Sequence, residues 1–176
     1  MGTFSLPAIQ DVPKLTEAER AVILDSLFEP SEELRTLSLG PLQEQSFQDY
    51  HHLILHVKSQ LDALLHSTSD LSRLDHILGS HPRLGEKKIE SAQSQSEQAQ
   101  LQSSDSNEAR QLMVLNSKYE ETFPSLRYVV FVNGRPRSVI LEDMQARIDR
   151  KDKHRERISA IEAMCDIALD RSRKLS

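Results

Sequence analysis

The sequence predicts an all-α protein, folded as a single compact multi-helix domain of 176 residues. Glycine is scarce, with 5 in the chain, and tryptophan is absent, whereas Leu, Glu, Gln, Arg and Ala are plentiful and favour helices. Apolar residues recur every three or four positions along much of the chain, as on the buried face of a helix. We expect one domain over residues 1–176, with residues 1–15 as a flexible or loosely packed N-terminal arm.

The first two helices are predicted from the residues that start and stop them. Thr16 and Glu19 have the spacing of a capping box, in which each side chain bonds the other residue's backbone N–H. This helix should end before Pro30. A second, shorter helix is expected over residues 31–37, because Gly40-Pro41 should stop it.

The clearest amphipathic pattern predicts a helix that begins at Ser46 and ends near Ser67. Its apolar stripe runs through Phe47, Tyr50, Ile54, Val57, Leu61 and Leu64. Asp70 should then cap a shorter helix that Gly79 terminates. His52 and His56 lie one turn apart and could share a metal, but no acidic or cysteine partner repeats the spacing. We interpret them as part of a solvated face and predict no metal site.

The second half of the chain is predicted from composition and turn signals. Residues 88–107 are polar and suit a disordered linker, but they lack Pro and Gly and favour a helix to about Leu101. The next helix should start at Ser106. Near residues 128–140, an apolar run followed by Asn133-Gly134 indicates either a hairpin or a short extended segment packed on helices. Ser138 should cap the helix after it. The last helix carries Ile158, Ile161, Cys165 and Leu169 on one line.

Charge and composition exclude several classes of function. The net charge of −5 argues against nucleic acid as a partner. No apolar run is long enough to span a membrane, and the first ten residues do not have the pattern of a signal peptide. The single Cys165 suits a reducing compartment. We expect a cytoplasmic or peroxisomal protein, although Ser176 follows the Arg-Lys-Leu that resembles a peroxisomal address.

Three groups of residues are candidates for chemistry. His81 follows a helix terminator and precedes Pro82, a residue favoured at the first helical position. A histidine at a helix start should stay neutral and able to exchange protons; the alternative is a junction residue that bonds a free backbone amide. Ser94, Glu97 and Gln98 share one helix face, although Ser94 and Glu97 also have capping-box spacing.

Arg171 is the third candidate. It continues the apolar line of Met164 and Ile167 at the end of the last helix, so its guanidinium should be partly buried and in need of an anion. We expect it to form an anion clamp at the mouth of a pocket shared with His81 and Glu97. The alternative is a C-terminal arginine that bonds the last carbonyls of its own helix.

Four motifs in series resemble one known family. They are HPRLG at 81–85, SQSEQ at 94–98, LNSKYEETF at 115–123 and VVFVNGR at 129–135. Over about residues 71–171 the chain is similar to 2-oxo-4-hydroxy-4-carboxy-5-ureidoimidazoline (OHCU) decarboxylases of urate breakdown. The resemblance implies an all-helical, often dimeric enzyme that uses no cofactor and releases carbon dioxide to give (S)-allantoin.

The resemblance also implies roles for individual residues. His81, Glu97 and Arg171 are expected to be catalytic: His81 transfers a proton, Glu97 orients the ring, and Arg171 binds substrate oxygens. The other expected substrate contacts are Pro82, Ser94, Gln98 and a backbone amide near Val129.

The chain departs from the family's pattern in several places. Arg83 stands where many members have Asp, and "FPSLRYVVF" has one residue more than the family's run in the stretch that contains Val129. The N-terminal third matches weakly, so no substrate contact is assigned there. The rival functions are an inactive helical interaction domain of the same fold and a lyase that acts on a related ureido acid.

Overall fold

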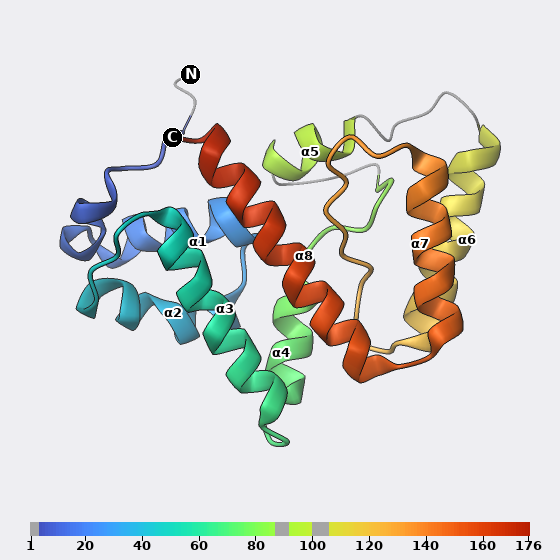
Figure 1. The fold of residues 1–176 in the computed structure, drawn as a ribbon, viewed down its shortest axis with the longest axis horizontal. Coiled ribbons are helices and arrows are strands. Elements are labelled where there is room, and N and C mark those ends of the chain that lie inside the picture. Colours follow the sequence, from blue (N-terminus) through green and yellow to red (C-terminus); the bar gives the residue numbers. More distant parts are fainter. Residues whose placement is uncertain (1–3, 87–91, 100–105) are drawn as a thin grey trace.

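The protein is all-helical, as predicted. The computed structural model describes residues 4–86, 92–99 and 106–176, and contains no strand within them (Figure 1). In chain order its elements are η1 (Ile9–Lys14), α1 (Glu17–Phe28), α2 (Glu32–Glu44), α3 (Tyr50–His66), α4 (Leu71–Leu78), α5 (Ala92–Gln98), α6 (Ser106–Thr122), α7 (Arg137–Arg150) and α8 (Lys153–Lys174). None of the described helices is long and apolar enough to cross a lipid bilayer.

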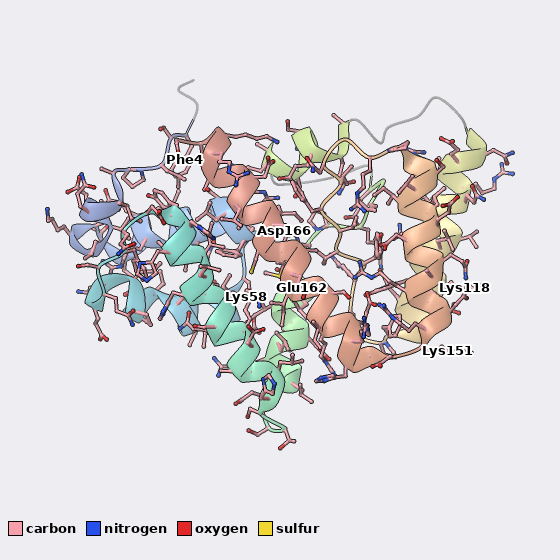
Figure 2. The ribbon with its side chains drawn as sticks, viewed as in Figure 1. Phe4, Lys58, Lys118, Lys151, Glu162 and Asp166 are labelled. Atoms are coloured by element: carbon pink, nitrogen blue, oxygen red, sulfur yellow. The ribbon has the colours of Figure 1, made fainter. Side chains whose placement is uncertain are left out.

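The long helix α8 is the centre of the fold. It crosses the middle of the molecule, with α1, α2 and α3 on one side and α6 and α7 on the other (Figure 1). Ile161 and Met164 are among its buried side chains, whereas Glu162 and Asp166 mark a narrow exposed stripe (Figure 2). Because α1, α3 and α4 pack directly on α8, its side chains can reach residues from distant parts of the sequence.

The N-terminal residues pack against the end of α8. The backbone N–H of Leu6 donates to the carbonyl of Leu175 at 2.7 Å, and Val12 is fully buried. The described part of the expected arm, from residue 4, therefore packs against the rest of the protein. The capping box that starts α1 is confirmed, with both reciprocal bonds between Thr16 and Glu19 present.

The expected stop at Gly40-Pro41 is wrong, because α2 continues through both residues to Glu44. Proline lacks the N–H that would bond the carbonyl four residues earlier, here that of Leu37. The side chain of Gln60 on α3 replaces it, since its Nε2 donates to the Leu37 carbonyl at 2.9 Å. A residue 23 positions away therefore preserves the helix.

Other helix starts also differ from the prediction. Helix α3 begins at Tyr50 rather than at Ser46, because Asp49 accepts a hydrogen bond from the His52 N–H and caps it. Helix α7 begins at Arg137 with Pro136 as its N-cap, so Ser138 is not the cap. Helix α5 covers Ala92–Gln98 of the expected helix, and the rest of that prediction, at 87–91 and 100–105, lies outside the described residues.

Residues 126–132 are extended but do not form a hairpin. A turn with left-handed Asn133 (φ 46°) and Gly134 (φ 71°) follows them, and the chain then enters α7. The second arm of a hairpin is absent because its residues belong to this helix. The extended segment packed on helices is thus the correct alternative of the two.

Candidate active site

His81 lies in a bend directly after α4. Gly79 ends this helix. Any larger residue would be crowded at that position, because its Cβ would lie 3.1 Å from the Asp75 carbonyl oxygen and 3.3 Å from that of Ser125. Beyond the bend, Arg127 Nη1 donates to the His81 carbonyl at 3.2 Å. The His81 residue is only 4% exposed, so the bend places an ionisable side chain inside the protein.

Burial, not a helix dipole, keeps His81 neutral. Residues 82–86 form a loop and turn, so the expected helix start at Pro82 is wrong. The pKa of His81 is lowered to about 4, mainly by burial; the positive charge of Arg171 adds to this shift, and the carboxylate of Glu29 opposes it. Nε2 is buried and has no hydrogen-bond partner in the described part of the chain. A neutral imidazole with an unsatisfied nitrogen is the result.

Helix α5 presents the Ser-x-x-Glu-Gln motif to the protein interior. Ser94 and Gln98 are buried, at 3% and 7% exposed, and the Glu97 side chain is 22% exposed. Gln98 holds the loop after His81, because it accepts from the Gly85 N–H at 2.9 Å and donates to the Arg83 carbonyl at 3.2 Å. The capping-box alternative is wrong, since Ser94 lies inside α5 rather than before it.

Arg171 pairs with two carboxylates inside the protein. Its Nε and Nη2 donate to Glu97 at 2.7 and 2.8 Å, and Nη2 also donates to Glu29 at 2.7 Å and to the Ser94 hydroxyl at 3.0 Å. Ser94 in turn donates to Glu29. Arg171 is 1% exposed. One guanidinium therefore joins α8, α5 and the end of α1.

Glu29 is a site residue that the sequence analysis did not find. It follows α1 with a positive φ of 72° and is 3% exposed. Burial by itself would raise its pKa, but the charge of Arg171 and hydrogen bonds from Ser94 and Arg171 hold the pKa below its ordinary value. A carboxylate directly after the apolar Leu27-Phe28 and before Pro30 was the available signal.

A pocket of about 360 Å³ opens between these elements, within the usual size range for small-molecule sites. Its lining comprises His81, Pro82 and Leu84 from the loop, Ser94, Ser96, Glu97 and Gln98 from α5, residues 128–134, and Ile167, Asp170 and Lys174 from α8. Six of the seven predicted site residues, including Val129, therefore share one pocket. Arg171 does not line it; its guanidinium lies behind Glu97 rather than at the opening.

The charged groups around the pocket are unevenly distributed. Glu97 and Asp170 are the acidic side chains that line it, and Lys174 is the basic one. Lys174 pairs with Asp170 at 2.5 Å, and the lysine side chain is 67% exposed. A small anion that enters the pocket would meet this lysine, which is paired with Asp170, at the surface, and the acidic Glu97 and the neutral His81 inside.

The described residues contain no group of three His, Cys, Asp or Glu side chains placed to hold a metal ion. His52 accepts a hydrogen bond from the Gln48 N–H at 3.3 Å, and its ring packs edge-on against Phe47. His52 is exposed, as expected for a solvated face, whereas His56 is half-buried, with its ring against Phe47 and its Nε2 buried.

The comparisons with known proteins give one match. The family model for OHCU decarboxylase matches residues 13–173, a range that contains α1, α5, α8 as far as Arg173 and every residue described around the pocket except Lys174. No protein with a curated description matches the chain.

Proposed function

The chain belongs to the OHCU decarboxylase family, whose activity is a decarboxylation in purine catabolism, and from this premise we propose that it converts OHCU to (S)-allantoin and carbon dioxide. The observation that carries the proposal is the buried, neutral His81 in the wall of a pocket that also contains Glu97. Burial of an unsatisfied imidazole nitrogen is unfavourable, so its presence in a pocket wall supports a bound partner that completes its hydrogen bonding.

The reaction needs one proton and no external electron acceptor. The carboxylate leaves as carbon dioxide, and the electron pair of the broken bond passes into the conjugated imine and ureido system of the ring. The imine nitrogen and the ring carbon that becomes the stereocentre then each gain a proton, while the ring hydroxyl loses its proton as it becomes a carbonyl, so that one proton is taken up in all. Because the substrate is its own electron sink, we propose that no cofactor takes part.

We assign the proton transfer to His81. A neutral imidazole can accept a proton from one substrate atom and return it to another, and the lowered pKa of His81 keeps it neutral at pH 7. Glu97 is proposed to accept hydrogen bonds from the ring or ureido N–H groups and so orient the ring. Pro82, Ser94, Gln98 and the backbone near Val129 would complete the contacts, since all line the pocket.

Arg171 is proposed to act through Glu97 and Glu29. Its Nε and Nη2 are used by these two carboxylates and by Ser94, so the anion clamp expected from the sequence does not match this geometry. A planar guanidinium can hold several oxygens in fixed directions. It would therefore keep Glu97 oriented toward the substrate, as a positioning residue.

The two rival functions make different predictions about the pocket. An inactive interaction domain does not need a buried histidine with an unsatisfied nitrogen, so this feature favours the enzyme. A lyase for another ureido acid would use the same groups, and the product has to distinguish it. We also propose a homodimer, in accordance with the family resemblance; light scattering during gel filtration would measure its mass.

The test is the chirality of the product. Urate, urate oxidase and the hydrolase that follows it generate the substrate, and circular dichroism follows (S)-allantoin as it forms. We expect the protein to accelerate formation of one enantiomer, and His81→Asn to be inactive while it retains the helical spectrum. Arg173→Ala, two residues beyond Arg171 and exposed, is the control and should be active. A racemic product formed at the uncatalysed rate with the wild-type protein would refute the proposal.

A further inference from the structure

The extended residues 128–134 are a thin wall between two hollows. All seven line the pocket described above, and Val130, Phe131 and Asn133 also line a second hollow formed with α7 and α8. The segment has no neighbouring strand in the described part of the chain. None of the backbone N–H groups of residues 127–134 donates to an acceptor in that part. This wall therefore lacks the ladder of hydrogen bonds that normally fixes an extended chain.

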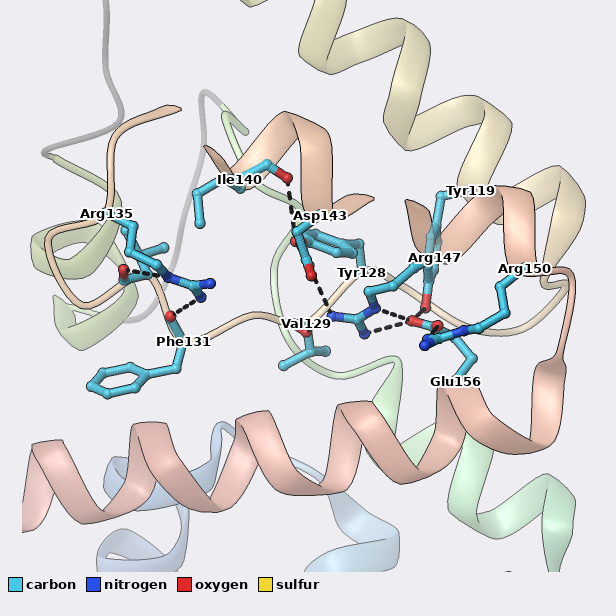
Figure 3. A network of polar contacts seen from close by, with 11 residues as sticks. Tyr119, Tyr128, Val129, Phe131, Arg135, Ile140, Asp143, Arg147, Arg150 and Glu156 are labelled. Carbon is cyan, nitrogen blue, oxygen red and sulfur yellow. Dashed lines mark hydrogen bonds and ion pairs between the residues drawn. The ribbon is translucent and has the colours of Figure 1, made fainter. Parts of the chain in front are cut away.

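Two arginines hold the wall by its carbonyl groups. Arg147 Nη1 donates to the carbonyl of Val129 at 3.0 Å. Arg135 donates to the carbonyl of Phe131, and its Nε donates to that of Val132 at 3.2 Å. Figure 3 shows both side chains directed at the segment. Both arginines line the second hollow, not the pocket that contains His81.

Arg147 is itself fixed by a buried network (Figure 3). Its Nε donates to Glu156 at 2.7 Å, and Glu156 is fully buried and also accepts from the Tyr119 hydroxyl at 2.7 Å. The guanidinium lies over the ring of Tyr128, 4.6 Å from its centroid. Helices α6, α7 and α8 thus converge on one guanidinium, which leaves it little freedom to move.

The stability of the fold alone does not explain why charged side chains are buried in this network. Two buried charges pay a desolvation penalty that often cancels their attraction, so an apolar replacement is commonly as stable. What an apolar side chain could not supply is a donor at the Val129 carbonyl. Lysine could pair with Glu156, but it is a single point charge and cannot reach both groups with a planar fork.

We propose that Arg147 and Arg135 are positioning residues that fix the 128–134 wall so that its free amides face the substrate. This inference rests on the proposed function, because it concerns the same pocket. Neither arginine touches the pocket; each acts through the carbonyl groups of the wall. Loss of either would let the wall shift, and the substrate would lose contacts with backbone amides.

The experiment compares Arg147→Lys and Arg135→Ala with a matched control. Arg157→Lys disrupts another, partly buried pair, in which Arg157 donates to Asp75 at 2.7 and 2.9 Å, and neither of these residues lines the pocket. Melting temperature measures the general loss of stability in each variant. KM does not depend on the folded fraction, so a change in KM reports the pocket itself.

We expect KM for OHCU to rise about 10-fold in Arg147→Lys and in Arg135→Ala, the effect of one lost hydrogen bond, and to stay unchanged in Arg157→Lys. Arg135→Ala leaves no buried charge unpaired, so it tests the inference even if Arg147→Lys fails to fold. The inference would be overturned if KM is unchanged in both Arg147→Lys and Arg135→Ala and these variants lose melting temperature in the same way as Arg157→Lys.

A second readout does not depend on activity. Cleavage by chymotrypsin after Tyr128 and Phe131 should be faster in Arg147→Lys and Arg135→Ala than in Arg157→Lys. Mass spectrometry after digestion under native conditions measures the rates. If the wild-type protein does not turn over OHCU, the proposed function fails, and the cleavage rates still decide whether the arginines order the wall. Equal rates in all variants would count against the inference.

Discussion

Replacement of His81 by Asn should remove a pH dependence of folding stability that wild type has below neutral pH. The pKa of His81 is about 4 in the folded protein and about 6.5 in an unfolded chain. Between these values the unfolded state binds a proton that the folded state does not. The folded pKa is the lower one, so stability is complete above about pH 6.5 and is lost as the pH falls toward 4.

The size of the effect follows from the two pKa values. At pH 7 most of the unfolded chains are already neutral at this position, and the loss in the free energy of unfolding is only a few tenths of a kcal/mol. At pH 5 it is about 2 kcal/mol, and below pH 4 it levels off at about 3 kcal/mol. Asn cannot ionise, so the variant should lack this contribution entirely while keeping a similar size and polar character.

Urea unfolding followed by circular dichroism at pH 7, 6 and 5 measures the free energy of unfolding of the wild-type protein and of His81→Asn. All other titrating groups are shared, so the wild-type minus His81→Asn difference in unfolding free energy isolates the histidine. We expect this difference to shift by about 2 kcal/mol against wild type between pH 7 and pH 5. A difference that stays constant over this range would show that His81 is accessible to protons when folded, and the reasoning from its burial would fail.

Three further variants test the rest of the site, each against Arg173→Ala, which should behave as wild type within about 0.5 kcal/mol. Glu97→Gln should lower kcat/KM about 100-fold because the ring loses its orientation, with a smaller effect on the melt; an unchanged rate would remove Glu97 from the chemistry. Arg171→Ala leaves Glu29 buried without its cation and should lose about 3–5 kcal/mol in urea unfolding; a melt like that of Arg173→Ala would contradict the buried cluster. Lys174→Gln should raise KM about 2- to 5-fold and make KM less sensitive to salt; the same salt dependence as wild type would exclude Lys174 from substrate capture.

Local patterns predicted the helices because their causes are local. The Thr16 and Glu19 capping box, the stripe that α3 buries and the terminator Gly79 all act within a few residues, and each appears where expected. The failure at Gly40-Pro41 has a long-range cause. Nothing near Pro41 indicates that Gln60 will supply the missing donor to Leu37.

The site shows the same division between local and distant causes. Motifs of a few residues made His81 and Glu97 candidates, and both line the same pocket. The partners of Arg171 could not be predicted this way, because Glu29 lies 142 positions earlier in the sequence. A buried arginine required an anion, but only the packing of α1 and α5 on α8 determines which carboxylates provide it. Because of this packing, Arg171 forms an internal ion pair in place of the predicted anion clamp.

The charge balance around the pocket has a consequence for the proposed reaction. Arg171 neutralises one of the two carboxylates that it bonds, so the cluster with Glu29 and Glu97 carries about one negative charge beside a neutral His81. A substrate carboxylate that enters meets repulsion, which disappears when it leaves as neutral carbon dioxide. Interactions that are more favourable in the transition state than with the bound substrate accelerate a reaction. Lys174 at the pocket surface would then serve capture, and the acidic interior would favour loss of the carboxylate.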